Sequence, residues 1–128
     1  MQKRLSSVIC CAIFLGSSAN AQVSLSSGHD LLPYCQYADN SLNGRGVPSG
    51  GTQQAVGEGL CMGIIAGIRY VVTSSIVDPK YRLCIPDNVS TGQALSVVVN
   101  YMRNRPDQLN NIFSTVALSA LVDTWRCK

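Results

Sequence analysis

The sequence predicts an all-α fold, a small four-helix domain cross-linked by two disulfides. Apolar residues recur three and four positions apart in several segments, a spacing typical of amphipathic helices. Segments rich in proline and glycine separate them, and no segment shows the sustained alternation that marks a strand. Outside a predicted signal peptide the chain has four cysteines, an even number that favours two disulfides in a small exported protein.

The first 21 residues have the form of a secretory signal peptide. Lys3 and Arg4 precede an apolar run, residues 5–15, which is too short to remain across a bilayer. A small-x-small sequence then ends at Ala21, where we expect signal peptidase to cut. The mature protein, residues 22–128, is expected to be one periplasmic domain with one core.

The balance of charge argues against two classes of partner. Because Lys3 and Arg4 leave with the signal peptide, the mature chain keeps 8 basic residues against 7 acidic ones, a net charge of +1. Nucleic acids and anionic membranes are bound by clustered Lys and Arg, whereas the basic residues here are scattered. We therefore expect neither as a partner.

The first predicted helix covers residues 26–37, behind a serine cap. Leu31, Leu32 and Cys35 fall on one side of it. Residues 38–52 are rich in Gly, Asn, Ser and Pro, and they predict a loop.

The second predicted helix covers residues 53–75 and is apolar around much of its circumference, so we expect it to be the central, most buried helix. Gly59, Gly63 and Gly67 recur every four residues, which predicts close contact with another helix of the same domain or of a dimer mate. The same spacing also occurs in transmembrane helices, but Arg69 near the middle of the apolar stretch favours a helix that is not stably inserted in a membrane.

Two further helices are predicted near the C-terminus. Ser90 and Gln93 have capping-box spacing at the start of the third helix, and Pro106 stops it. The fourth runs from near Asn111 to Cys127. The predicted core stripes are Leu95, Val98, Val99 and Met102 in the third helix and Leu118, Leu121, Val122 and Trp125 in the fourth.

The sequence contains no constellation that supports catalysis. His29 is the only histidine, and its sequence neighbours would point in different directions from one helical turn. The carboxylates are dispersed, and no glycine-rich loop carries the lysine that holds a phosphate. No cysteine pair has the C-x-x-C spacing of a zinc site. We therefore predict no catalytic residue, no metal and no cofactor, and a protein that is not an enzyme.

Several short motifs together resemble the Rap/Tai family of periplasmic immunity proteins. The motifs are LLPYC at residues 31–35, CMGIIAGI at 61–68, CIP at 84–86, and WRC at 125–127, with Tyr101 ahead of Arg105 and Pro106. The resemblance covers nearly all of the mature chain. Ile64 and Arg69 depart from it, because the family often has an aromatic and an acidic residue at these places.

The resemblance implies a small helical inhibitor, often dimeric, that protects a bacterium from a peptidoglycan amidase delivered by type VI secretion. It would block the amidase active site with a protruding surface segment. An acid-stress periplasmic chaperone of the small disulfide-bonded type is an alternative, although the mature chain has few acidic groups to titrate. A cell-envelope enzyme with an unrecognised site is a third.

We predict that Cys35 is bonded to Cys61 and Cys84 to Cys127, while the sequence alone leaves the other two pairings open. The connections on either side of the third helix are the candidate partner-binding segments, with ordinary solvated loops as the alternative. Tyr81 and Arg82 are favoured because these residue types are enriched among binding hot spots. The full candidate set is Asp78, Lys80, Tyr81 and Arg82 before the helix, and Arg103, Asn104, Arg105 and Asp107 after it.

Overall fold

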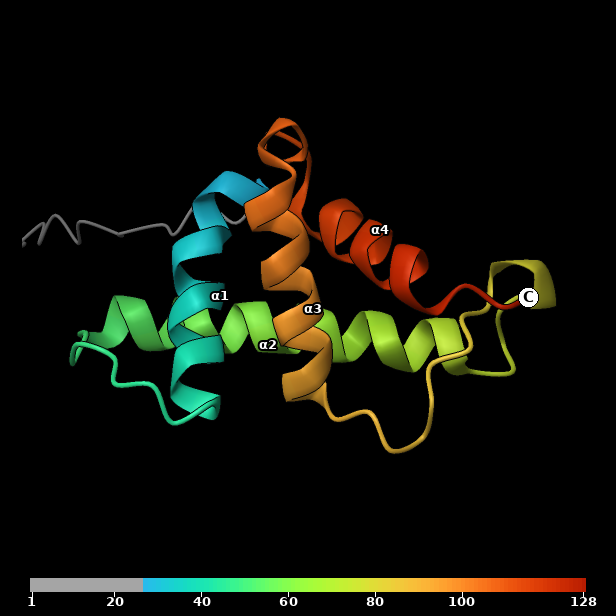
Figure 1. Ribbon diagram of the computed structural model, residues 1–128, viewed down its shortest axis with the longest axis horizontal. Helices are drawn as coiled ribbons and strands as arrows, with labels where there is room; N and C mark the ends of the chain where they lie inside the picture. Colours follow the sequence, from blue (N-terminus) through green and yellow to red (C-terminus); the bar gives the residue numbers. More distant parts are fainter. Residues whose placement is uncertain (1–26) are drawn as a thin grey trace, which may run out of the picture.

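A computed structural model describes residues 27–128 of the chain, and the predicted signal peptide lies outside the described residues. The described part is all α, with two isolated bridges and no strand, which confirms the predicted fold class. The described residues form four α-helices and two short 3₁₀ turns, arranged as Figure 1 shows. Their bounds are α1 Gly28–Leu42, α2 Thr52–Thr73, η1 Pro79–Tyr81, α3 Thr91–Asn104, η2 Pro106–Gln108 and α4 Phe113–Trp125.

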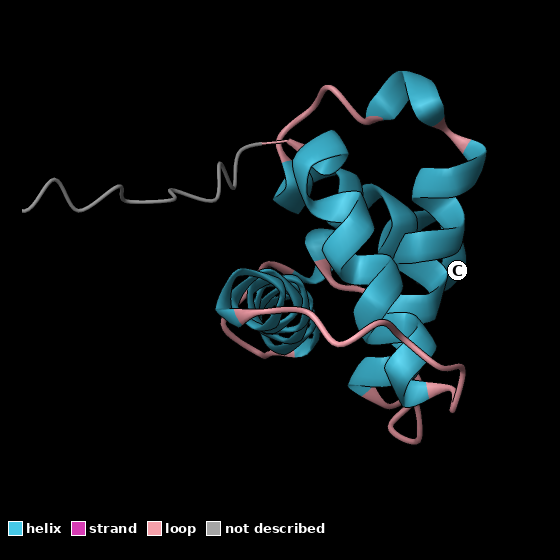
Figure 2. Ribbon diagram, turned by 90° about the vertical axis from the view of Figure 1, so that its left-hand side faces the viewer, coloured by secondary structure: helices cyan, strands magenta, loops and turns pink. Residues whose placement is uncertain are grey.

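The helices form two layers. In Figure 1, α1 and α3 lie side by side and cross α2, while α4 packs beside α3. Figure 2 looks nearly along the axis of α2 and shows the other three helices on one side of it. One face of α2 therefore closes the core, and no helix of residues 27–128 lies against its opposite face.

The centre of the domain is α3. Its predicted stripe of Leu95, Val98, Val99 and Met102 is buried as expected, together with Ala94. The predicted capping box is present in full, because Ser90 Oγ accepts from the Gln93 N–H and Gln93 Oε1 accepts from the Ser90 N–H. This cap fixes where the central helix begins.

The expectation that the second helix is the most buried was wrong. Only Gly57, Cys61, Ile65 and Val72 of α2 are buried. By length and composition alone α2 could cross a membrane, with a mean hydropathy of 1.5 over 18 residues. The structure instead places its buried side against α1 and α3, where Cys61 and Ile65 are wholly inaccessible to solvent. Apolar composition predicted the helix but not which faces would be covered.

The first helix is longer than predicted, since α1 continues to Leu42. Ser27 caps its start, but its last residues fall within the stretch predicted as a loop. Ala38 and Asp39 are buried there, and the Asp39 carboxylate accepts from Asn43 Nδ2 and Arg45 Nη2, each at 3.0 Å, and from the Ser96 hydroxyl. These contacts hold a turn of helix that composition alone did not reveal.

The fourth helix begins at Phe113, two residues after the predicted start. Its predicted stripe was partly wrong, because Leu118 is 39% exposed and Val122 is only half-buried. The core side of α4 is formed mainly by other residues, two of them alanines. The buried residues of α4 are Phe113, Val116, Ala117, Ala120 and Leu121.

Both predicted disulfides are present. Cys35–Cys61 joins α1 to α2, with its Cα atoms 5.5 Å apart. Cys84–Cys127 joins the segment before α3 to the end of the chain, with its Cα atoms 5.0 Å apart. Each bond links parts of the fold that are distant in sequence, so each restricts the unfolded chain more than the folded one.

The glycines of α2 pack differently from the prediction. A Cβ added at Gly59, Gly63 or Gly67 would meet nothing within 4 Å, so these glycines contact no other helix of the domain. The close approach is at Gly57, where an added Cβ would lie 2.3 Å from Cγ of Tyr34. The expected contact within the domain is therefore wrong for the glycine stripe, and a contact with a dimer mate stays a prediction.

Candidate partner-binding surface

The segment from Asp78 to Arg82 forms a capped turn that presents an aromatic side chain. The Asp78 carboxylate accepts from the Lys80 N–H at 3.0 Å, and the Tyr81 N–H donates to the Asp78 carbonyl at 2.9 Å. Pro79 starts the 3₁₀ turn with a backbone dihedral suited to it. The Tyr81 side chain is 65% exposed, and Lys80 Nζ lies 4.7 Å from its ring centroid.

The residues that follow fasten this turn to the domain at two places. The Leu83 N–H donates to the Val72 carbonyl at 3.0 Å, which ties the segment to the end of α2. The Cys84 N–H donates to the Trp125 carbonyl at 2.9 Å, beside the disulfide to Cys127. Tyr81 is thus displayed from a short, cross-linked segment and not from a free loop.

The Arg82 side chain forms hydrogen bonds with the backbone of nearby residues. Its Nε donates to the Val77 carbonyl at 2.8 Å, and its Nη2 donates to the Ser75 carbonyl at 3.0 Å. The side chain is half-buried as a result. Of the favoured pair, Tyr81 is therefore presented outward, while Arg82 fixes the turn after α2 and keeps its charge at the surface.

Beside Tyr81 lies a hollow of about 580 Å³ between the end of α2, the 77–83 segment and α4. Its lining is mainly apolar, with three cationic side chains among it. We call this cavity the α2–α4 hollow. It is lined by Val71, Val72, Val77, Leu83, Leu118 and Val122, and by Lys80, Tyr81, Arg82 and Arg126.

Sequence reasoning missed most of this hollow. Leu118 and Val122 have core-like spacing, and Val71 lies in a helix that is apolar all round, so none of them stood out as a surface residue. Ile76, between the end of α2 and the proline turn, is 81% exposed but does not line the hollow. An apolar residue just beyond a helix end, before a proline turn, is a candidate for exposure.

The second predicted cluster lies elsewhere, at the far end of α3. All four of its residues, Arg103, Asn104, Arg105 and Asp107, are exposed. The Arg105 guanidinium lies 5.4 Å from the Tyr101 ring centroid. Figure 1 places this end of α3 well away from η1, so the structure does not bring the two clusters together. They are separate candidate surfaces.

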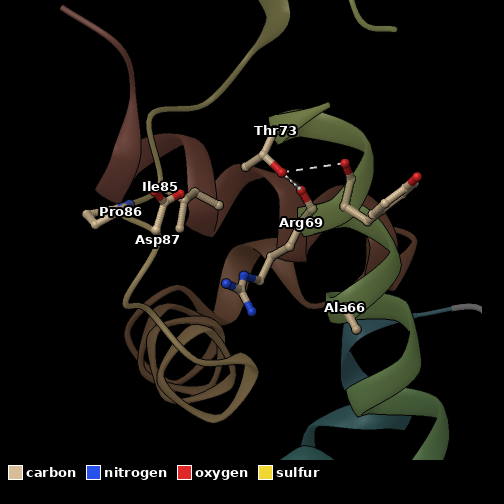
Figure 3. Close-up of a pocket in the computed structure, with 7 residues that line it drawn as sticks. Ala66, Arg69, Thr73, Ile85, Pro86 and Asp87 are labelled. Carbon is tan, nitrogen blue, oxygen red and sulfur yellow. Dashed lines mark hydrogen bonds between the residues drawn. The ribbon is translucent and has the colours of Figure 1, made fainter. Parts of the chain in front are cut away.

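Arg69 lines another hollow, of about 290 Å³, between α2 and residues 85–87 (Figure 3). Its guanidinium donates to the Thr91 hydroxyl at 2.9 Å and to the Val89 carbonyl, which fastens α2 to the start of α3. The Nε atom is buried and has no partner among the described residues. Arg69 therefore acts as a brace inside the fold, which explains a charge within an apolar helix.

The charges of the α2–α4 hollow are not neutralised within the described chain. The one ion pair in residues 27–128 joins Arg45 to Asp39, with Nη2 and Oδ2 at 3.0 Å. No aspartate or glutamate lines the hollow that contains Lys80, Arg82 and Arg126. This patch is positive although residues 22–128 together carry a net charge of only +1.

Comparison with known proteins identifies the family. A protein-family model described as Rap1a immunity proteins matches residues 27–127, a span that includes all four helices and both disulfides. No match was found among curated proteins or among solved structures. The match confirms the resemblance seen in the sequence motifs. The chain belongs to the Rap1a immunity protein family.

Proposed function

We propose that this chain is a periplasmic immunity protein that binds a peptidoglycan amidase delivered by type VI secretion and blocks its active site. Family membership implies immunity against a secreted effector, and therefore binding to that effector. The amidase, the secretion route and the periplasmic location are our extension of it. The predicted signal peptide supports the location, because peptidoglycan and its amidases meet in the periplasm.

The observation that carries the proposal is the exposed Tyr81 on its disulfide-anchored turn beside an apolar hollow. An inhibitor that acts by occlusion needs a few strong anchors on a surface that loses little freedom on binding. Tyr81 offers a large aromatic group with few rotatable bonds, and the 3₁₀ turn already fixes its backbone. The turn and the hollow together form a surface suited to an enzyme cleft.

The experiment is protection in the periplasm. An amidase effector secreted by the producing strain is exported in a sensitive host, together with the unmodified chain, Tyr81→Ala or Tyr70→Ala. Tyr70 is a matched control, since it is 75% exposed and lines the Arg69 hollow instead. We expect the unmodified chain and the Tyr70 variant to protect cells, and the Tyr81 variant to fail.

Lysis of cells that contain the correctly exported, folded, unmodified chain would overturn the proposal. Protection of periplasmic proteins against acid aggregation, without effect on the amidase, would favour the chaperone alternative. Full protection by Tyr81→Ala would remove this turn from the inhibitory surface.

A further inference from the structure

We propose that the α2–α4 hollow receives one segment of the effector in which an apolar side chain stands next to carboxylates. This inference rests on the proposed function and adds the chemistry of the partner. The proposed occupant is a stretch of polypeptide that is both acidic and apolar. The apolar residues of the lining favour its apolar side chain, and the cationic residues favour its carboxylates.

The floor of the hollow, which includes Val72 and Leu83, favours an apolar side chain in the occupant. Val72 and Leu83 are each only 8% exposed and continue the domain core, whereas Val71 is 46% and Leu118 39% exposed. The hollow therefore grades from core to open surface. Its volume of about 580 Å³ lies within the range of sites that enclose small ligands. A large aliphatic or aromatic side chain with its adjoining backbone fits such a space, and removing this lining from water favours binding.

The rim of the hollow, formed by Lys80, Arg82 and Arg126, favours carboxylates in the occupant. Lys80, Arg82 and Arg126 bring three positive charges to the lining and no negative one. The nearby Asp78 faces its own turn, where its carboxylate accepts the Lys80 N–H at 3.0 Å, and the exposed Asp123 on α4 is not part of the lining. Complementary charge across an interface speeds encounter and fixes register. An acidic segment satisfies this rim, and a basic one is repelled by it.

The same rim argues against a second copy of this chain in the hollow. A symmetric pair formed through this surface would place three cations against the same three cations. Like charges brought together in this way cost free energy and select against the wrong partner. A partner of opposite charge is therefore the better occupant.

The hollow is also preformed. The disulfide between Cys84 and Cys127 and the hydrogen bond from Leu83 to Val72 fix its outer wall. Arg82 is held at two backbone carbonyls, so its charge is positioned before any partner arrives. A rigid site loses less conformational entropy when it binds than a flexible loop does.

The first test uses synthetic peptides on the mature chain, with valine and leucine methyl groups labelled for NMR. One nine-residue peptide carries a central leucine and phenylalanine flanked by glutamates, and its counterpart has glutamines instead. We expect the acidic peptide to shift the methyl signals of Val71, Leu118 and Val122, and to bind roughly tenfold more tightly than the glutamine peptide. Equal binding of the two peptides, or shifts confined to other residues, would overturn the inference.

The second test uses an amidase effector of the producing strain and charge-reversed variants that are checked for folding by circular dichroism. Lys80→Glu with Arg126→Glu should weaken binding of the amidase at least about tenfold. The control, Thr52→Glu with Gln53→Glu, adds negative charge at two exposed positions at the other end of α2, outside the hollow, and should stay within about twofold. Leu118→Trp, which fills the hollow without changing charge, should also weaken binding.

These outcomes separate the inference from the proposed function. If the unmodified chain inhibits the amidase but rim reversal and Leu118→Trp leave its affinity unchanged, the inference fails while the function stands. If the unmodified chain does not bind the amidase, the proposed function fails and the inference falls with it.

Discussion

Cys84 and Trp125 are paired through their backbones: the N–H of Cys84 donates to the carbonyl of Trp125 at 2.9 Å, at the last residue of α4. The disulfide to Cys127 lies two residues further along the chain. One short stretch of backbone thus receives both a covalent and a hydrogen-bonded link to the C-terminus. Its consequence is a fixed outer wall for the hollow beside Tyr81.

Removing that disulfide by Cys84→Ala with Cys127→Ala should lower the free energy of unfolding by about 2 to 4 kcal/mol, because a loop of this length gains freedom in the unfolded chain. Chemical denaturation measures this change. Hydrogen exchange should also become faster at the amides of residues 83 and 84. Unchanged protection of those two amides would show that hydrogen bonds alone hold the segment.

Two glycines of α2 should respond to alanine with opposite signs. Gly57→Ala places a methyl group 2.3 Å from Cγ of Tyr34, so the ring must move, and we expect a loss of about 1 to 3 kcal/mol. Gly63→Ala meets nothing within 4 Å and should gain roughly 0.5 to 1 kcal/mol from helix propensity.

Urea unfolding of both variants, with their mass in solution measured in parallel, checks this pair. A stabilised Gly57→Ala would contradict the packing described. If Gly63→Ala instead shifts a dimer toward monomer, the glycine stripe is a contact between two copies.

The buried carboxylate of Asp39 should be worth more to stability than an exposed one. Asp39→Ala leaves Ser96, Asn43 and Arg45 without their common acceptor, and a loss of about 1 to 3 kcal/mol is expected. The control is Asp107→Ala, whose exposed carboxylate accepts from Gln108, and it should change stability by less than about 0.5 kcal/mol. Thermal unfolding measures the melting temperatures of the two variants. Equal values would count against the role given to Asp39.

Local sequence signals predicted the parts of the fold that depend on near neighbours. The capping box at Ser90 and Gln93 lies within one turn of chain, so it could be predicted and is present. The end of α1 could not be, because Asp39 owes its helical position to Ser96 on α3, 57 residues away. Gly57 was missed for the same reason, since only the tertiary fold brings Tyr34 against it.

In the candidate site, too, local sequence predicted some features, while others depend on the tertiary fold. Tyr81 could be selected from its residue type and from its place near Cys84, and it is exposed. The anchoring of Arg82 to two carbonyls depends on how the chain turns after α2, which no local pattern specified. Leu118 and Val122 have core spacing, yet the buried side of α4 is formed by other residues, and these two line a surface hollow.

Cleavage of the signal peptide is tested by the intact mass of the exported protein. We expect a chain that begins at Gln22, with Cys10 and Cys11 removed and the four remaining cysteines oxidised. A product that retains residues 1–21, or that stays in the membrane fraction after a carbonate wash, would contradict export as a free domain.

The most direct measurement is inhibition of an amidase effector of the producing strain, acting on purified peptidoglycan, by increasing amounts of the mature chain. Occlusion predicts that hydrolysis falls to zero at a fixed molar ratio of chain to enzyme, and that peptidoglycan and the chain compete for the enzyme. Tyr81→Ala should require far more protein for the same effect. Full amidase activity in the presence of a saturating excess of the folded, disulfide-bonded chain would contradict the account.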